Sequence, residues 1–238
     1  MIDELLPEPV VAVEAFGEEG VREFGNAPLY PQEEALVARA VAKRRREFTV
    51  VRSCARRAME KLGVPAQAVL PGERGAPQWP DGLTGSMTHC AGYCAAALVR
   101  AADLASLGID AEPHEPLPEG VLSAVALPAE AERLGRLAAD RPEVHWDRLL
   151  FSAKESVYKA WFPLTRKWLD FSEADIDLTP APGAATPVTG HAEGAEGVFR
   201  ARLLVPGPVV GDHRLGHFDG RWTVRRGLVA TAVTVHHG

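Results

Sequence analysis

The sequence has few cysteines, no long apolar run and no excess of positive charge. Its 238 residues include three cysteines, Cys54, Cys90 and Cys94, and this odd, sparse count argues against a disulfide framework. The first residues carry neither a basic start nor an apolar stretch, so we expect no signal peptide. Because no run of about 18 apolar residues occurs, we also expect no membrane span and a cytoplasmic protein.

A zinc site is also disfavoured. His89, Cys90 and Cys94 stand close together, which would suit the first part of such a site. A structural zinc ion usually takes four ligands, commonly with a second Cys/His pair downstream, and no such pair is evident in the sequence. We therefore interpret these three residues without a metal.

The charge balance restricts the partners of the protein. A net charge of −6, from 26 basic and 32 acidic residues, argues against a general nucleic-acid-binding protein. The positive charge is nevertheless concentrated in one stretch, at Lys43, Arg44, Arg45, Arg46, Arg52, Arg56 and Arg57. A local basic cluster on an acidic protein suits a small polyanionic ligand, and the alternative is a helix face whose charges are solvated.

Hydrophobic periodicity and turn residues predict the order of helices and strands. We expect helices at residues 33–62 and 145–162, the latter closed by Pro163, and one or two helices over 119–139, punctuated by Pro128. A hairpin over 85–99 and a strand over 104–110 follow the first helix. We expect further strands at 168–171, 175–178, 198–205, 221–226 and 228–236, with loops at 64–82 and 180–197.

The order of these elements predicts the fold class. Each half places helical material before strands, which indicates an α+β chain of two similar α/β lobes. The lobes would join near residues 105–115, giving an N-terminal lobe over 1–108 and a C-terminal lobe over 109–238. No sequence repeat proves a duplication. A ligand site at the seam between the lobes is the expected arrangement.

Asp110 and Glu112 form the first candidate site. Residues two apart in a strand point to the same side, so the two carboxylates would project together. Adjacent carboxylates repel and favour a cation between them, and hard oxygen ligands favour Mg²⁺ or Mn²⁺ over zinc. The alternative is an exposed strand, on which such acidic triplets are common.

Glu155 lies on the predicted helix 145–162, beside Lys154 and one turn before Lys159. It could serve as a third metal ligand, with the two lysines neutralising phosphate charge or donating a proton. The alternative for Glu155 and Lys159 is a surface ion pair worth a few tenths of a kcal/mol.

His89 follows the hydroxyl residue Thr88 at a predicted strand end. A ring nitrogen and a hydroxyl in this arrangement can bind phosphate. A hydrogen-bonded core histidine is the alternative.

Three motifs carry these residues in one order along the chain. They are Gly85-Ser-Met-Thr-His89, Gly108-Ile-Asp-Ala-Glu112 and Lys154-Glu-Ser-Val-Tyr-Lys159. Together with the run from Lys43 to Arg56 and the stretch Gly75-Ala-Pro-Gln-Trp-Pro80, they resemble the Sfp/EntD type of 4′-phosphopantetheinyl transferase. The resemblance covers roughly residues 30–178 and implies a pseudo-dimeric fold with the active site at the seam.

The resemblance implies a Mg²⁺-dependent transfer of the phosphopantetheine arm of coenzyme A to a serine of a carrier protein, with release of 3′,5′-ADP. Asp110, Glu112 and Glu155 would hold the metal ion, with a water in place of a ligand at Ala111. Glu155 would also orient or deprotonate the serine, directly or through water. Lys159 would assist the leaving phosphate, with Lys154 as an electrostatic helper.

The N-terminal lobe would hold the 3′-phosphate of coenzyme A. Arg44, Arg52 and His89 match family positions with that role, Arg74 matches a basic position near the nucleotide, and Thr88 would add a hydroxyl donor.

The resemblance also implies the partners. Apo acyl or peptidyl carrier proteins of polyketide, fatty-acid or nonribosomal-peptide synthases are expected, in siderophore or antibiotic assembly, with the enzyme acting as a monomer. The carrier would dock near the seam and helix 119–139. Two alternatives stay open: a non-catalytic coenzyme A or nucleotide binder, and a metal-dependent nuclease or phosphohydrolase.

Overall fold

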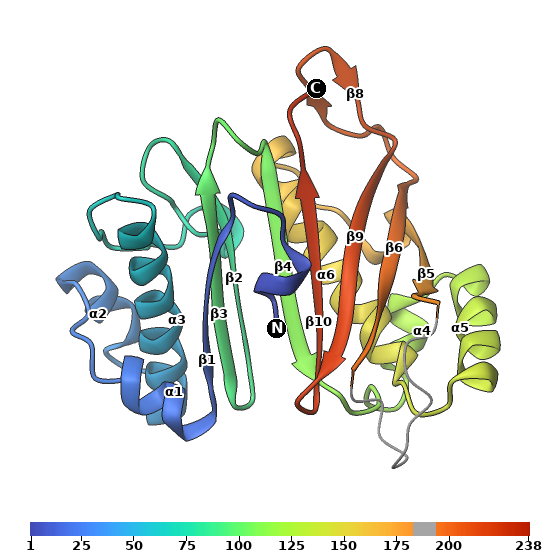
Figure 1. Cartoon of the computed structure of the whole chain (residues 1–238), viewed down its shortest axis with the longest axis horizontal. Coiled ribbons are helices and arrows are strands. Elements are labelled where there is room, and N and C mark those ends of the chain that lie inside the picture. The colour runs from blue at the N-terminus through green and yellow to red at the C-terminus, as the bar shows by residue number, and fades with distance from the viewer. Residues whose placement is uncertain (183–193) are drawn as a thin grey trace.

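The computed structural model describes residues 1–182 and 194–238 as an α+β fold of two halves (Figure 1). The N-terminal half consists of β1 (Val11–Phe16), α1 (Gly17–Phe24), α2 (Pro31–Val37), α3 (Ala42–Lys61), β2 (Leu83–Cys90) and β3 (Tyr93–Arg100). The C-terminal half begins with β4 (Ser106–Pro113), α4 (Val121–Val125), α5 (Pro128–Asp140) and α6 (Trp146–Thr165). It continues with β5 (Ala174–Pro180), β6 (Ala195–Leu203), β7 (Val209–Val210), β8 (His213–Arg214), β9 (His217–Arg225) and β10 (Leu228–Val235).

Two antiparallel sheets form the centre of the molecule. The first has the order β1-β3-β2 and the second the order β4-β10-β9-β6-β5, while β7 and β8 form a small separate ribbon. Strand β2 is an edge strand of the first sheet and β4 an edge strand of the second, and the two lie side by side where the sheets meet (Figure 1). We call this junction the seam.

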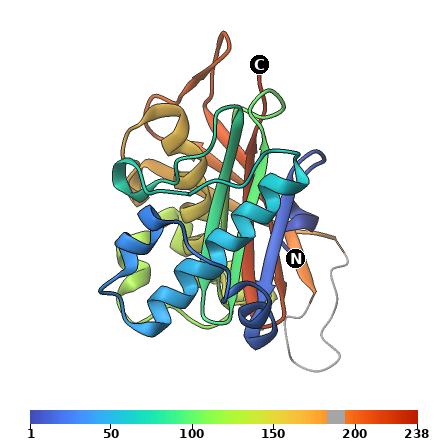
Figure 2. The same ribbon diagram turned by 90° about the vertical axis from the view of Figure 1, so that its left-hand side faces the viewer.

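The strands near the seam are buried on both faces, and the side chains of alternate residues pack into two different hydrophobic clusters. In β3, Cys94, Ala96 and Leu98 pack with α3, whereas Ala95 and Ala97 face the opposite side. This alternation follows from the two-residue period of a strand. On the opposite side, Met1, Ile2, Leu5 and Leu6 pack against β3, β4 and β10, so the N-terminal segment lies over the seam (Figure 1). Figure 2 shows this segment and α6 on opposite sides of the strands.

Several predicted elements are confirmed. The hairpin is β2 and β3, the strand after it is β4, and the region 119–139 contains two helices divided before Pro128. The last four predicted strands correspond to β5, β6, β9 and β10. No helix in the described ranges is long and apolar enough to cross a membrane.

Other predictions need correction. The expected helix 33–62 is divided into α2 and α3, because the buried Glu33 of α2 folds back to pair with Arg56 of α3 at 2.9 Å. Helix α6 continues past Pro163 to Thr165, and Arg166 ends it with a φ of 55°. Residues 168–171 form no strand, since a short 3₁₀ helix, η3 (Phe171–Glu173), begins there with Asp170 as its cap.

The first 30 residues contain structure that the pattern did not predict, namely η1 (Asp3–Leu5), β1 and α1. The ends of the expected loop over 180–197 belong to strands, because Pro180 is the last residue of β5 and β6 begins at Ala195. Most of that loop, residues 183–193, lies outside the described residues.

Candidate functional site

A cleft of about 670 Å³ lies at the seam. Its N-terminal wall comes from α3, β2 and the loop around the 3₁₀ turn η2 (Glu73–Gly75), and its C-terminal wall comes from α6. The side chains that line it include Arg44, Arg52, His89, Glu155 and Lys159. The structure therefore brings predicted residues from both halves into one cavity.

Arg44 and His89 meet at the N-terminal wall. Arg44 Nη1 lies 2.9 Å from His89 Nε2. A guanidinium can only donate, so Nε2 accepts and the ring is neutral, with its proton on Nδ1. Partial burial and the Arg44 charge lower the pKa of His89 from its usual 6.5.

Arg52 is held more rigidly than Arg44. Its guanidinium lies 3.2 Å from the centre of the Phe48 ring, and Nε donates to the Val69 carbonyl at 3.0 Å. Burial lowers its pKa to about 10, so it stays charged at neutral pH. The guanidinium is therefore a fixed positive charge at the wall of the cleft.

Two other arginines of the basic stretch have structural partners. Arg45 pairs with Glu34 at 2.6 Å, and Arg56 pairs with Glu33. Both pairs connect α3 to α2, so this part of the basic stretch fastens helices together.

Arg74 lines the cleft and contacts a residue of the C-terminal half. Its backbone has a φ of 54°, and its guanidinium lies 5.5 Å from the centre of the Trp168 ring. Trp168 is 55% exposed and stacks on Tyr158 of α6, with ring centres 5.0 Å apart. The contact between Arg74 and Trp168 connects the two halves at the rim.

Asp110 is buried at the centre of the seam, and its two oxygens differ. Oδ1 accepts hydrogen bonds from Lys159 Nζ at 2.8 Å and from Thr88 Oγ1 at 3.3 Å. Oδ2 is buried and has no hydrogen-bond partner within the described ranges. Lys159 Nζ also donates to the Ile109 carbonyl at 3.1 Å. Thr88 thus contacts Asp110, a partner that the prediction of a phosphate donor did not include.

Glu112 projects on the same side of β4 as Asp110 and pairs with Arg148 of α6 at 3.1 Å. Arg148 also donates to the carbonyls of Glu115 and Pro116, at 3.1 and 2.9 Å. Burial and the Asp110 charge raise the pKa of Glu112, and Arg148 opposes this shift.

Glu155 is half-buried on the wall formed by α6. Burial raises its pKa, Lys159 opposes the shift, and the Asp110 charge adds to it. Asp110 therefore raises the pKa of both other acidic residues, which a cation among them would relieve.

The fit to a divalent metal is partial. The free Oδ2 of Asp110 and the repulsion among the carboxylates suit a hard cation. However, within the described ranges no group of three His, Cys, Asp or Glu side chains is gathered as a metal site. Arg148 and Lys159 occupy the positions beside the carboxylates instead, so the three-ligand site stays a prediction.

Two predicted details differ from the geometry. Ala111 is fully buried in the core on the opposite face of β4, so it does not stand at a position that a metal-bound water would take. Lys154 is 3% exposed and its ammonium contacts Glu130 at 2.8 Å and the carbonyls of Phe171 and Ala174 at 2.6 and 3.1 Å. These three acceptors direct Lys154 away from the cleft.

Comparison with known proteins identifies the family. The profile of the 4′-phosphopantetheinyl transferase N-terminal domain matches residues 32–99, and that of the 4′-phosphopantetheinyl transferase superfamily matches 106–203. The chain is 56% identical over 235 residues to the 4′-phosphopantetheinyl transferase Svp of Streptomyces mobaraensis, covering 99% of this chain and 89% of that protein. The chain belongs to the 4′-phosphopantetheinyl transferase family. The 4′-phosphopantetheinyl transferase PptT of Mycobacterium tuberculosis is 46% identical to this transferase, over 99% of this chain and 98% of that protein.

Family membership confirms the predicted transferase and decides against the two alternatives. With a relative 56% identical over 99% of the chain, this transferase is an enzyme, neither a passive coenzyme A binder nor a nuclease or phosphohydrolase. A more distant similarity, 35% identity over 119 residues, links half of the chain to enterobactin synthase component D of Salmonella typhi.

Sequence reasoning missed Arg148, Glu130 and Trp168 of this transferase. Arg148 lies one turn from Ser152 on α6, on the side of Glu112, but no motif marks it. The burial of Lys154 could be predicted from its spacing in the sequence. Lys154 stands four residues after Leu150 and three before Val157, which are both fully buried, so it lies on the apolar side of α6. A lysine on such a stripe needs a buried acidic partner.

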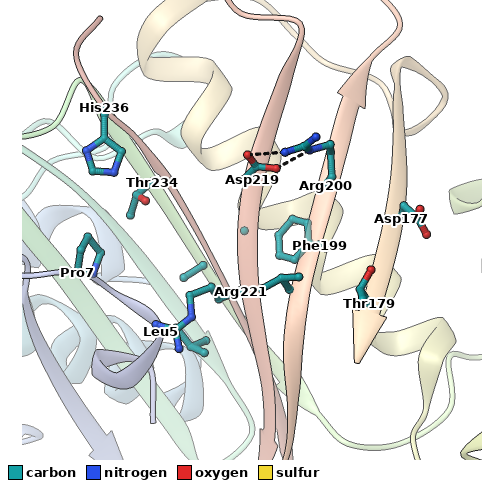
Figure 3. A pocket seen from close by; sticks show the side chains of 13 residues that line it. Leu5, Pro7, Asp177, Thr179, Phe199, Arg200, Asp219, Arg221, Thr234 and His236 are labelled. Atoms are coloured by element: carbon teal, nitrogen blue, oxygen red, sulfur yellow. Dashed lines mark hydrogen bonds and ion pairs between the residues drawn. The ribbon is translucent and has the colours of Figure 1, made fainter. Parts of the chain in front are cut away.

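The transferase has a second hollow, of about 620 Å³, on the face of the second sheet opposite α6 (Figure 3). Among its lining residues, Arg200 of β6 forms two hydrogen bonds with Asp219 of the neighbouring β9, at 2.7 and 3.1 Å, and Arg221 extends toward Leu5 (Figure 3). This hollow contains none of the motif residues. Its paired charges are typical of a solvated sheet face.

Proposed function

We propose that the cleft at the seam binds coenzyme A. Its N-terminal wall would hold the 3′-phosphate, and its C-terminal wall would carry the residues for transfer. The observation that carries this proposal is the meeting of cationic side chains of α3 and β2 with the motif residues of α6 in one cavity. Arg44, Arg52 and His89 would hold the 3′-phosphate, and Arg74 would lie near the nucleotide. Fixed cations suit a phosphate because charge-assisted hydrogen bonds are about twice as strong as neutral ones.

The acidic residues would hold Mg²⁺, with Mn²⁺ as the alternative. Asp110, through its unpartnered Oδ2, together with Glu112 and Glu155, would supply the oxygen ligands. When bound, the ion would neutralise charge on the diphosphate of coenzyme A. When the ion is bound, its bonds to the carboxylates would replace part of the contacts of Glu112 with Arg148 and of Asp110 with Lys159.

The transfer itself is a displacement at phosphorus. The oxygen of the carrier serine forms a bond to the phosphorus of the phosphopantetheine arm, and the bond to the bridging oxygen of the diphosphate breaks. The bridging oxygen leaves with the electron pair as part of 3′,5′-ADP. Glu155 would take the serine proton, directly or through water, and its raised pKa suits a general base. Lys159 would stabilise the charge on the leaving phosphate.

The proposed lobes are residues 1–108 and 109–238, related as a pseudo-dimer. Both halves place their first strand beside their last strand, with β1 next to β3 and β4 next to β10. Both also pack a helix of 20 residues against the sheet, α3 in the first half and α6 in the second. These shared features support an internal duplication.

The proposed partners are apo acyl or peptidyl carrier proteins. The similarity to enterobactin synthase component D supports a role beside a nonribosomal-peptide synthase in siderophore assembly, and polyketide and fatty-acid carriers are further candidates. We place the carrier near the seam and helices α4 and α5, on a monomeric, cytoplasmic enzyme.

A mass spectrum of the carrier tests this proposal. The protein is incubated with coenzyme A, Mg²⁺ and an apo carrier from each class of synthase. We expect the carrier to gain one phosphopantetheine, and we expect Asp110→Ala and Glu155→Ala to abolish the gain while the fold stays intact. Near-normal activity of either variant at ordinary Mg²⁺ would contradict the site.

A further inference from the structure

The seam is held by two hydroxyl groups in place of a backbone ladder. Within the described ranges, β2 and β4 belong to different sheets. Two backbone N–H groups of β4 instead donate to side chains of β2: Ile109 N to Ser86 Oγ at 3.1 Å and Ala111 N to Thr88 Oγ1 at 3.2 Å. Both hydroxyl residues are buried, so these bonds satisfy donors that water does not reach.

Thr88 differs from Ser86 in one respect. A hydroxyl has one proton to donate and two lone pairs. Thr88 accepts from Ala111 N and donates to Asp110 Oδ1 at 3.3 Å, whereas no hydrogen bond joins Ser86 to Asp110 within the described ranges. Thr88 therefore couples the seam to the carboxylate.

The contact decides which oxygen of Asp110 is available. Thr88 and Lys159 both donate to Oδ1, and together they leave Oδ2 as the oxygen without a partner. Lys159 comes from α6 and Thr88 from β2, so the carboxylate is held from both halves of the molecule. A carboxylate fixed in this way cannot rotate to exchange its oxygens without breaking both bonds.

From this geometry we propose that Thr88 is a positioning residue, which holds Asp110 through Oδ1 so that the buried, unpartnered Oδ2 is the oxygen left for a divalent cation. This inference rests on the proposed function of the cleft. Thr88 acts through Asp110 and does not contact the 3′-phosphate. His89, the next residue on the strand, lines the cleft, so one short segment sets the phosphate contact and the orientation of the carboxylate.

Three variants test the proposal. Thr88→Val keeps the shape and removes the hydroxyl, and Thr88→Ser restores it. Ser86→Ala removes the other hydroxyl bond across the seam and is the control for kcat. Because Ser86 also lines the cleft, any effect of its loss on coenzyme A binding appears in KM. The measurements are kcat, KM for coenzyme A, melting temperature, and Mn²⁺ binding by electron paramagnetic resonance without carrier.

We expect Thr88→Val and Ser86→Ala to lower the melting temperature to a similar extent, because each leaves one N–H of β4 unpaired. Only Thr88→Val should lower kcat, by about tenfold, the rate equivalent of one hydrogen bond of about 1.4 kcal/mol. It should also weaken Mn²⁺ binding and leave KM for coenzyme A unchanged, and Thr88→Ser should recover both kcat and Mn²⁺ binding.

Equal losses of kcat in Thr88→Val and Ser86→Ala would overturn the proposal, since the seam alone would then explain them. A raised KM with unchanged kcat would also overturn it, because Thr88 would then contact the substrate. If Thr88→Val does not fold, Thr88→Ala provides the same comparison, because it also removes the hydroxyl. A wild-type protein that modifies no carrier would refute the proposed function itself, independently of Thr88.

Discussion

Single residues at the site differ in how well the sequence predicts them. Motif matches selected Arg44, His89, Glu155 and Lys159, and all four line one cleft. The same reasoning treated Lys154 as a second cleft lysine, although it lies on the buried side of α6. A motif records residue types and spacing, and it does not record which side of the helix packs against the core.

Because His89 is neutral in the free protein, coenzyme A binding should be coupled to proton uptake. Its pKa is lowered by burial and by Arg44, so at pH 7 the ring binds less proton than a free imidazole. A bound 3′-phosphate would favour the charged ring and raise this pKa, so coenzyme A binding at pH 7 should be accompanied by proton uptake. Calorimetry in buffers of different ionisation enthalpy measures this uptake.

Two controls isolate the imidazole. Dephospho-coenzyme A should give no such uptake, and His89→Gln should remove the uptake seen with coenzyme A. The same proton uptake with both ligands would show that His89 does not meet the 3′-phosphate.

The lowered pKa of His89 also affects stability. The contribution of His89 to the free energy of unfolding is present above pH 6.5 and is lost as the pH falls through the lower pKa of the folded state.

Among the elements, β4 and α6 approach each other closely at Gly108. A Cβ on Gly108 would overlap the Ser156 carbonyl and lie 2.7 Å from Ala160 N. This approach sets the distance between Asp110 on β4 and Lys159 on α6. The glycine of the second motif therefore has a packing reason that can be read from the structure.

We predict that Gly108→Ala lowers both stability and kcat, because α6 must move away from β4. Gly135→Ala in α5 is the control, since its Cβ would meet nothing within 4 Å. Alanine in a helix interior is more stable than glycine by about 0.5–1 kcal/mol. Thermal unfolding and transfer kinetics of both variants measure the difference. A Gly108→Ala enzyme with normal kcat would show that this spacing does not govern the site.

The buried pair of Lys154 and Glu130 holds α6, α5 and β5 together. Glu130 also accepts from Leu127 N and Ile176 N, both at 2.7 Å, so its two oxygens are satisfied. Removal of one partner leaves a buried charge, which costs about 3–5 kcal/mol. The pair therefore has a structural explanation that requires no contact with substrate.

We expect Lys154→Met to lower the free energy of unfolding by about 3 kcal/mol or more while KM for coenzyme A stays unchanged. The double variant Lys154→Met/Glu130→Gln removes both charges and should recover part of the loss. Denaturant unfolding and steady-state kinetics provide both readouts. Normal stability with abolished transfer would restore the chemical role that the sequence suggested.

At the scale of elements, periodicity predicted most helices and strands of the second half, because their apolar stripes are regular. The break between α2 and α3 was not predictable in this way, since it depends on an ion pair between Glu33 and Arg56. The strand β1 was missed because its place is set by pairing with β3, from Val11↔Leu98 to Phe16↔Tyr93. Such partners lie far away along the chain.

In the whole molecule, two sheets meet at a seam where no backbone pairing joins them within the described ranges. Residues from both halves complete the cleft there, and the N-terminal segment covers the opposite side. The sequence predicted two lobes and a site between them. It could not predict that hydroxyl groups of β2 would join the sheets, because a serine or threonine hydroxyl has many equivalent partners before the chain is folded.

In the proposed division of the cleft, the N-terminal wall holds the 3′-phosphate and the C-terminal wall carries the residues for transfer. Arg44→Ala separates the two roles, because Arg44 is exposed and its loss should disturb the fold little. Arg46→Ala, an exposed arginine on the same helix, is the matched control. The measurement is KM for coenzyme A and for dephospho-coenzyme A in carrier modification.

We predict that Arg44→Ala raises KM for coenzyme A about tenfold, the equivalent of one charge-assisted hydrogen bond of about 1.5 kcal/mol, and leaves KM for dephospho-coenzyme A unchanged. Arg46→Ala should change neither. Equal increases for both substrates in Arg44→Ala would contradict the account.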